Sequence, residues 1–224
     1  MRLLAVSAAI AFSLAAAPFA QAAPDQQQAV DEALNVVRAV HDGSGDIAAK
    51  TRELIHHSRA VLIVPELVKG GFIFGAQGGT GVLLARDDRD NWSDPAFYDL
   101  GAASFGFQIG IEVSKVVLII MSDRALNAVM ENKVKLGAEA GLAIATLGAG
   151  AEASTTTNAG ADIYVVAESK GLFGGVAIEG GVMSPHHEWD AAYYGRDVSA
   201  RDIVVHRTVS NPGAAALRRA LGEI

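Results

Sequence analysis

One glycine-rich apolar stretch constrains the fold of this chain more than any other part of the sequence. Residues 70–86 read GGFIFGAQGGTGVLLAR, with six glycines among seventeen positions. A Walker phosphate loop needs Gly followed by Lys and then Ser or Thr, and a dinucleotide site needs Gly-x-Gly-x-x-Gly before a helix. The stretch has neither spacing. Glycine inside a strand instead marks a bulge, a tight bend or the close approach of another backbone, so we predict strands of a bent sheet here.

Four other segments have the pattern of β-strands. Residues 105–113, FGFQIGIEV, alternate bulky and small side chains with the two-residue period of a strand, and residues 175–182, GVAIEGGV, behave similarly. Residues 60–64 are typical of a short buried strand that ends at Pro65, and the apolar run 116–121, VVLIIM, is typical of the most buried one. The patterns predict an α+β fold with a bent, glycine-rich antiparallel sheet or half-barrel.

Helical patterns flank this β-rich part at both ends of the chain. Val30, Leu34 and Val37 recur at the spacings of three and four residues that an amphipathic helix shows. Further helices are expected at about residues 46–58, 123–133, 185–194 and 212–221. We therefore predict one domain over residues 23–224, with N-terminal helices at about 25–58, a β-rich core at about 60–184 and a C-terminal helical tail at about 185–224.

The first 22 residues have the pattern of a secretory signal peptide. Arg2 precedes the apolar run 3–17, and Ala20, Gln21 and Ala22 give the small-x-small pattern that signal peptidase recognises. We expect cleavage after Ala22, because a cut one residue later would leave Pro24 first. The apolar run is short for a membrane span, and no cysteine follows it for lipid attachment. We expect an exported bacterial protein of the periplasm that is not a lipoprotein.

The composition excludes several classes of function. The net charge is −7, and removal of Arg2 with the signal makes it −8. A negative protein lacks the overall basic character that phosphate backbones attract, so nucleic acid is not an expected partner. The chain contains no cysteine, which excludes disulfides and thiolate metal sites.

Catalytic motifs are missing, and the histidines are the remaining candidates for chemistry. The sequence has no Gly-x-Ser-x-Gly, no Ser-x-x-Lys and no His-Glu-x-x-His. Two adjacent pairs occur, at residues 56–57 and 186–187. If the pairs met in space, with Glu188 or Asp190 completing the shell, they would form a zinc or copper site. A metal-dependent hydrolase is therefore an alternative, beside the simpler interpretation of surface histidines.

Four segments together resemble one known family. They are VPELVKGGFIFGAQGGTGVLLAR (64–86), NWSDPAFYDLGAASFGFQIGIEVSKVVLII (91–120), SKGLFGGVAIEGGV (169–182) and AAYYG (191–195). In order and spacing they resemble the SYLF domain, and the resemblance covers almost the whole chain after the signal. It implies a non-enzymatic phospholipid-binding domain without a cofactor. Eukaryotic members of the family bind phosphoinositides, and yeast members also bind actin filaments.

The resemblance directs attention to cations and aromatic residues within its motifs. The candidate lipid-binding residues are Lys69, Arg86 and Lys170 for headgroups, with Phe72, Trp92 and Phe173 as interfacial aromatics. Trp92 lies in a turn-like acidic segment and is the leading candidate for an exposed aromatic. Two further elements, Trp-Ser-x-Pro at 92–95 and Tyr-Tyr-Gly at 193–195, either contact lipid or only build the fold.

The expected compartment changes the expected partner. The periplasm offers neither actin nor, ordinarily, phosphoinositides, so a bacterial phospholipid or membrane surface is the nearest substitute. The alternative is a structural or protein-assembly module, comparable to the actin-binding relatives, that self-associates without binding lipid.

Overall fold

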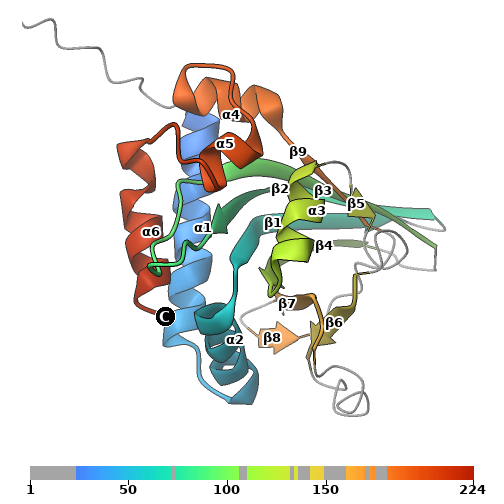
Figure 1. Ribbon diagram of the computed structural model, residues 1–224. Coiled ribbons are helices and arrows are strands. Elements are labelled where there is room, and N and C mark those ends of the chain that lie inside the picture. The colour runs from blue at the N-terminus through green and yellow to red at the C-terminus, as the bar shows by residue number, and fades with distance from the viewer. Residues whose placement is uncertain are drawn as a thin grey trace, which may run out of the picture.

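A computed structural model describes residues 24–71, 74–105, 110–131, 134–135, 142–148, 160–169, 172–174 and 181–224. The expected signal segment lies outside these residues. The described chain forms one sheet with helices packed on both of its faces (Figure 1), which confirms the α+β prediction. Among the described helices, none combines the length and the apolar character that crossing a bilayer requires.

The sheet is mixed, with one parallel pair. Its strands are β1 (Ala60–Gly71), β2 (Phe74–Ala85), β3 (Ala96–Phe105), β4 (Gly110–Ile120), β5 (Val134–Lys135), β6 (Ile144–Leu147), β7 (Ile163–Ser169), β8 (Leu172–Gly174) and β9 (Val182–Pro185). The order is β5-β9-β3-β2-β1-β4-β7-β6, and β8 pairs with β7 outside this path. The predicted antiparallel pairing holds except between β6 and β7, which are parallel. Fifteen residues separate these two strands, and a parallel pair needs such a long connection.

Helices cover both faces of the inner part of the sheet. They are α1 (Pro24–Asp42), α2 (Asp46–His57), α3 (Asp123–Glu131), α4 (His187–Tyr194), α5 (Ala200–Val204) and α6 (Ala215–Gly222), the last preceded by a 3-10 turn at Pro212–Ala214. Helices α1, α2, α4 and α6 pack on one face, called the α1 face below. Helices α3 and α5 pack on the opposite face, called the α3 face. Figure 1 shows α1 and α3 on opposite sides of the central strands.

Alternate residues of each central strand enter the two cores. In β1, Val61 and Ile63 pack on the α1 face, whereas Leu62 and Val64 pack on the α3 face, as the two-residue period of a strand requires. All four side chains are at most 1% exposed. Residues 116–120 of β4 are likewise buried on both faces, which confirms the prediction of a fully buried strand there. Continuous apolar runs are what a sheet covered on both faces needs.

Strand β1 does not end at Pro65, as the sequence pattern predicted, but continues through a β-bulge. Val64 pairs with Val116 on β4, and the next pair joins Leu67 to Ser114, so β1 contains one extra residue. Proline has no N–H to donate to a ladder, and a bulge is one of the few places in a sheet where it fits.

The bulge explains two of the glycines of β2. A Cβ on Gly81 would lie 2.5 Å from the carbonyl oxygen of Ile63, and one on Gly79 would lie nearer to the carbonyl oxygen of Glu66 than real Cβ atoms approach. A Cβ added to Gly78 would lie on the opposite face of the sheet, 3.8 Å from its nearest atom. Backbone contact therefore requires glycine at 79 and 81 but not at 78.

The Trp-Ser-x-Pro and Tyr-Tyr-Gly elements build the fold. Ser93 Oγ accepts a hydrogen bond from the backbone N–H of Ala85 at 3.0 Å. The hydroxyl of Tyr194 donates to the carbonyl of Pro95 at 2.6 Å. Gly195 ends α4 in the left-handed region, with φ of 68°, where glycine has no steric penalty. These contacts tie the segment before β3 to the C-terminal helices.

A buried carboxyl group also joins α4 to β3. Asp190 is 0% exposed, and its Oδ1 accepts a hydrogen bond from the backbone N–H of Phe97 at 2.9 Å. Its Oδ2 has no hydrogen-bond partner within the described part of the chain. Burial raises the pKa of Asp190 to about 7, because the ionised form loses its hydration. The carboxyl group is therefore protonated in the folded protein at acidic pH.

The glycine contacts predict the effect of single methyl additions. Gly79→Ala and Gly81→Ala should each lower the free energy of unfolding by about 2 kcal/mol or more, because strand backbone must move to relieve the overlap. Gly78→Ala is the matched control in the same strand and should change it by less than about 1 kcal/mol. Urea unfolding measures all three. Equal losses for Gly78→Ala and Gly79→Ala would contradict the proposed backbone contact.

The raised pKa of Asp190 predicts a dependence of stability on pH. Unfolded Asp titrates near pH 3.9, so Asp190 adds stability that is complete below about pH 4 and is lost as pH rises through its folded pKa of about 7. Asp190→Asn keeps an oxygen for the Phe97 N–H and cannot ionise. Relative to this variant, the wild type should lose roughly 2 kcal/mol of unfolding free energy between pH 5 and pH 8.

Urea unfolding at the two pH values measures this difference. Asp197→Asn, at an exposed position, serves as the control and should leave the pH profile unchanged. A constant difference between the wild type and Asp190→Asn across this range would show that Asp190 is ionised in the folded protein.

Candidate functional site

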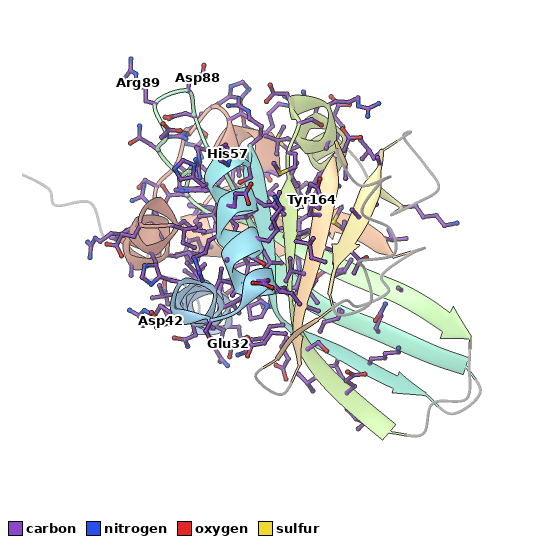
Figure 2. The ribbon with its side chains drawn as sticks, turned by 90° about the horizontal axis from the view of Figure 1, so that it is seen from below. Glu32, Asp42, His57, Asp88, Arg89 and Tyr164 are labelled. Carbon is purple, nitrogen blue, oxygen red and sulfur yellow. The ribbon has the colours of Figure 1, made fainter. Side chains whose placement is uncertain are left out.

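The outer part of the sheet extends beyond the helices and exposes apolar side chains. Figure 2 shows strands of the central sheet continuing past the helical layer. Ile111 is 80% exposed there, Val113 47%, Val68 41% and Val182 36%. Large aliphatic side chains are normally buried, and a contiguous exposed group of them marks a binding surface.

These side chains lie on the same face of the sheet. Val68 pairs with Val113 across β1 and β4, and Gly101 pairs with Val182 across β3 and β9. Alternate residues of a strand lie on the same face. Along β4 this alternation from the buried Val117 places Val113 and Ile111 on the α1 face, and the strand pairing places their neighbours there too. We call this surface the open face; its members are Val68, Gly70, Gly78, Gly101, Ile111, Val113 and Val182.

Glycines make the centre of the open face shallow. An added Cβ on Gly70 would meet no atom within 4 Å, and the nearest contacts at Gly78 and Gly101 are 3.8 and 3.9 Å. These positions are therefore open to solvent. Neighbouring strands lie about 4.8 Å apart, so the band from Val182 to Val113 is roughly 20 Å long.

A hollow of about 380 Å³ lies at one end of the open face. Its lining includes Asp99 and Ser184, which pair across β3 and β9. Asp99 Oδ1 accepts a hydrogen bond from Thr80 Oγ1 at 2.9 Å, and His186 Nδ1 lies 3.1 Å from the same oxygen. The Asp99 side chain is 48% exposed, and no Lys or Arg of the described part of the chain forms an ion pair with it. The hollow therefore combines an accessible carboxylate with an apolar floor.

A second hollow of about 580 Å³ lies between α1 and the bulge. Glu32 of α1 and Glu66 of the bulge line it, together with Val113 of the open face. Lys115 also lines it, but its Nζ lies 3.3 Å from both carboxylate oxygens of Glu168 and is thereby neutralised. The rim of the open face is thus acidic at both hollows.

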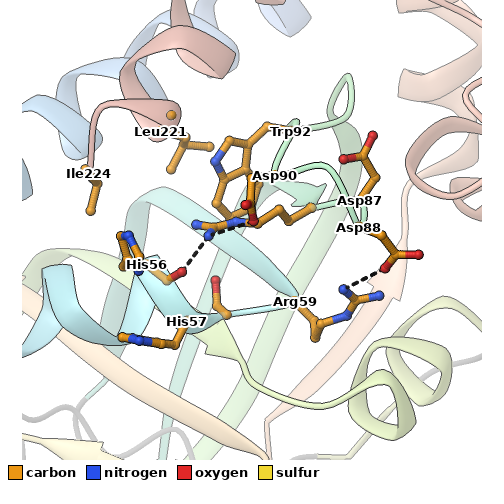
Figure 3. A pocket seen from close by; sticks show the side chains of 12 residues that line it. His56, His57, Arg59, Asp87, Asp88, Asp90, Trp92, Leu221 and Ile224 are labelled. Atoms are coloured by element: carbon orange, nitrogen blue, oxygen red, sulfur yellow. Dashed lines mark hydrogen bonds and ion pairs between the residues drawn. The ribbon is translucent and has the colours of Figure 1, made fainter.

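Two of the predicted lipid-binding residues meet in a separate cleft of about 590 Å³ (Figure 3). The guanidinium of Arg86 donates to the carbonyls of Ile55 and His56 at the end of α2, at 2.8 and 2.5 Å. It also lies over the ring of Trp92, 4.7 Å from its centroid. The carbonyls at a helix C-terminus have no partner within the helix. That of Ile55 also accepts from the backbone N–H and the hydroxyl of Ser58, and Arg86 adds a further cap that holds α2 on the sheet.

Of the other predicted residues, Lys69 is the one whose position the structure describes together with its side chain, and it lies apart from this pair. The prediction of an exposed Trp92 is wrong, because the ring packs under Arg86 and only 5% of the residue is exposed. Lys69 lies on the outer part of β1 opposite Glu112 and Gln77, on the α3 face. Lys170 and Phe72 lie outside the described residues, and only the backbone of Phe173 is described, in β8.

The histidine pairs do not form one site. The rings of His56 and His57 lie in the cleft with their centroids 5.0 Å apart, whereas His186 stacks on Trp189 beside Asp99. Within the part of the chain that the structure describes, no group of three or more His, Asp or Glu side chains is arranged to hold a metal ion. The metal-hydrolase interpretation gains no geometric support there.

Sequence reasoning missed the residues that the open face brings together. The two-residue period did place Ile111 and Val113 on a bulky face, but it gave no sign that the covering helices end before them. Asp99 was one of many scattered carboxylates, and only the strand register reveals that it adjoins this surface. Gly78 and Gly101, which pair with each other, were the feature of the sequence that could have indicated an uncovered part of the sheet.

Comparison with known proteins identifies relatives. The family described as "Ysc84: Las17-binding protein actin regulator" matches residues 101–224. SH3 domain-containing YSC84-like protein 1 of Rattus norvegicus is 34% identical over 144 residues, which cover 64% of this chain and 42% of the relative. The human protein of the same name is 33% identical over the same length.

A yeast relative extends the match. LAS seventeen-binding protein 3 of Saccharomyces cerevisiae is 31% identical over 163 residues, covering 71% of this chain and 36% of the relative. The matches span less than half the length of these relatives. The name of the yeast relative is that of a binding protein. By this match and by its motifs, the chain belongs to the Ysc84 family, the family of the SYLF domain.

Proposed function

We propose that the protein is a non-enzymatic phospholipid-binding module of the bacterial envelope. The observation that carries the proposal is the open face, where Ile111, Val113 and Val68 stand exposed on neighbouring strands outside the helical cover. Transfer of one such aliphatic side chain from water to an apolar phase contributes about 1.5–3 kcal/mol. Several together supply enough free energy to hold the sheet end against lipid acyl chains.

The charge around the open face defines the preferred lipid. Glu32 and Glu66 line the hollow at one end of the apolar band, and Asp99 lines the hollow at the other. An anionic membrane repels these carboxylates. Binding should therefore depend on apolar insertion and prefer lipids without net charge. This differs from the cationic site expected from the sequence, because Arg86 is engaged by α2 and Lys69 lies on the opposite face.

A charge placed in the apolar band tests the proposal. The mature chain from Ala23 should co-sediment with vesicles of phosphatidylcholine and phosphatidylethanolamine in equal parts, with little change between low and moderate salt. Ile111→Asp should weaken binding at least about fivefold, since a buried aliphatic contact is replaced by a carboxylate. The exposed position of Ile111 means that folding should be unaffected.

Val205→Asp is the matched control. Val205 is 43% exposed and follows α5, outside the open face, so this variant should bind as the wild type does. Failure of the wild type to sediment with these vesicles, or wild-type binding by Ile111→Asp, would refute lipid binding through the open face.

Protein binding is the second candidate function. The names of the relatives, Las17-binding regulators of actin, favour it, and an exposed apolar sheet face suits a protein partner as well as a lipid. Self-association of the lipid-free chain that increases with concentration and is abolished by Ile111→Asp would support this candidate. Analytical ultracentrifugation measures it.

A further inference from the structure

We propose that the hollow beside Asp99 binds the headgroup of an aminophospholipid, with the primary ammonium at Asp99 and the phosphate at Lys135. The inference rests on the proposed lipid-binding function and gives it a specificity. The chemistry recognised is a primary ammonium linked to a phosphate, whether in a membrane lipid or in a free phosphodiester.

One carboxylate oxygen of Asp99 is available to a ligand. Thr80 and His186 both contact Oδ1. Among the described residues, none forms a hydrogen bond or ion pair with Oδ2 of this half-exposed carboxylate, which lines the hollow. Ser184 stands directly across from Asp99 on β9, and its hydroxyl lines the same hollow. A primary ammonium carries three N–H donors, and a carboxylate with a neighbouring hydroxyl accepts two of them.

The same geometry selects against other headgroups. Choline is a quaternary ammonium without N–H donors, and proteins bind it within aromatic cages, whereas this hollow is floored by Gly78, Gly101 and Val182. A glycerol headgroup leaves the lipid with a net negative charge, which Asp99 repels. An ethanolamine headgroup meets both conditions. Its terminal ammonium group is positive and carries three N–H donors, and the lipid as a whole has no net charge.

A cation for the phosphate lies on the strand next to Val182, which lines the hollow. Lys135 of β5 pairs with Val182 of β9, and paired residues of neighbouring strands share a face. Lys135 is exposed, and no side chain of the described residues forms an ion pair with it. Asp99 and Lys135 therefore flank Val182 with opposite charges, which complements a zwitterion.

The open face continues from this hollow toward the apolar band. From Val182 the row runs through Gly101 and Gly78 to Val68. The two glycines leave the strand backbone uncovered, so a hydrocarbon chain can lie directly on the sheet. One lipid thus places its headgroup at the edge of the sheet and its acyl chains along the open face.

Vesicle binding with three compositions tests the specificity. Phosphatidylcholine vesicles are compared with vesicles in which half the lipid is phosphatidylethanolamine or phosphatidylglycerol. The wild type should bind the ethanolamine vesicles about five- to tenfold more tightly than the other two, as one charge-assisted hydrogen-bonded contact provides. Asp99→Asn should abolish this preference, and Ser184→Ala, which cannot disturb the charge balance, should reduce it.

Two further variants complete the set. Lys135→Gln should weaken binding to choline and ethanolamine vesicles alike, because both carry the phosphate. Asp42→Asn removes an exposed carboxylate whose partner in the described part of the chain is its neighbour His41, and it should retain the preference. Equal wild-type binding to all three vesicles, or a preference that survives Asp99→Asn, would overturn the headgroup site while leaving lipid binding intact.

A soluble headgroup separates the two proposals. Glycerophosphoethanolamine should shift the amide NMR signals of Gly78 and Gly101 in the wild type but not in Asp99→Asn, and glycerophosphoglycerol should shift neither. These shifts without any vesicle binding would support the headgroup site and identify a free phosphodiester as its ligand. Their absence in the wild type, with no vesicle preference, would eliminate the site.

Discussion

The β-bulge of β1 is the constraint on which the rest of the structure depends. By adding one residue between Val64 and Leu67, it reverses which residues of the strand face which side. Leu67 therefore enters the α3-face core at 2% exposure, and Val68 turns outward on the open face. The same bulge presses backbone carbonyls onto β2, which requires glycine where a sheet would otherwise favour larger side chains. The bulge thus determines the packing of the core, the positions of the glycines in β2 and the exposure of the open face.

The motifs that identify the family do mostly structural work in this chain. Ser93 and Tyr194 bond to backbone groups that join the entry of β3 to α4, and Arg86 with Trp92 fixes the end of α2. Such contacts leave these groups little capacity for a ligand. The surface that is free to bind lies elsewhere, on the outer strands, where the side chains are small or aliphatic.

The charged residues around the open face determine which ligands it suits. An apolar band with carboxylates at both hollows differs from the basic surface that an anionic ligand needs, and Lys115, which lines one hollow beside Val113, is paired with Glu168. Membership of the Ysc84 family by itself assigns no ligand to this protein. The combination of Asp99, Lys135 and the glycine row instead suits a zwitterionic amphiphile, which joins the lipid and headgroup proposals in one surface.

The sequence by itself determined the elements of this protein and their class. The continuous apolar run located the buried strand at residues 116–120, and the spacing of Val30, Leu34 and Val37 located α1. The motifs indicated the family. Local patterns carry this information because each depends on neighbouring residues. Only the tertiary structure decided that β1 passes through Pro65, that Trp92 is buried, and that Asp99 adjoins Val182. These facts depend on register and on where a helix ends above a sheet, which are set by contacts between segments far apart in the chain.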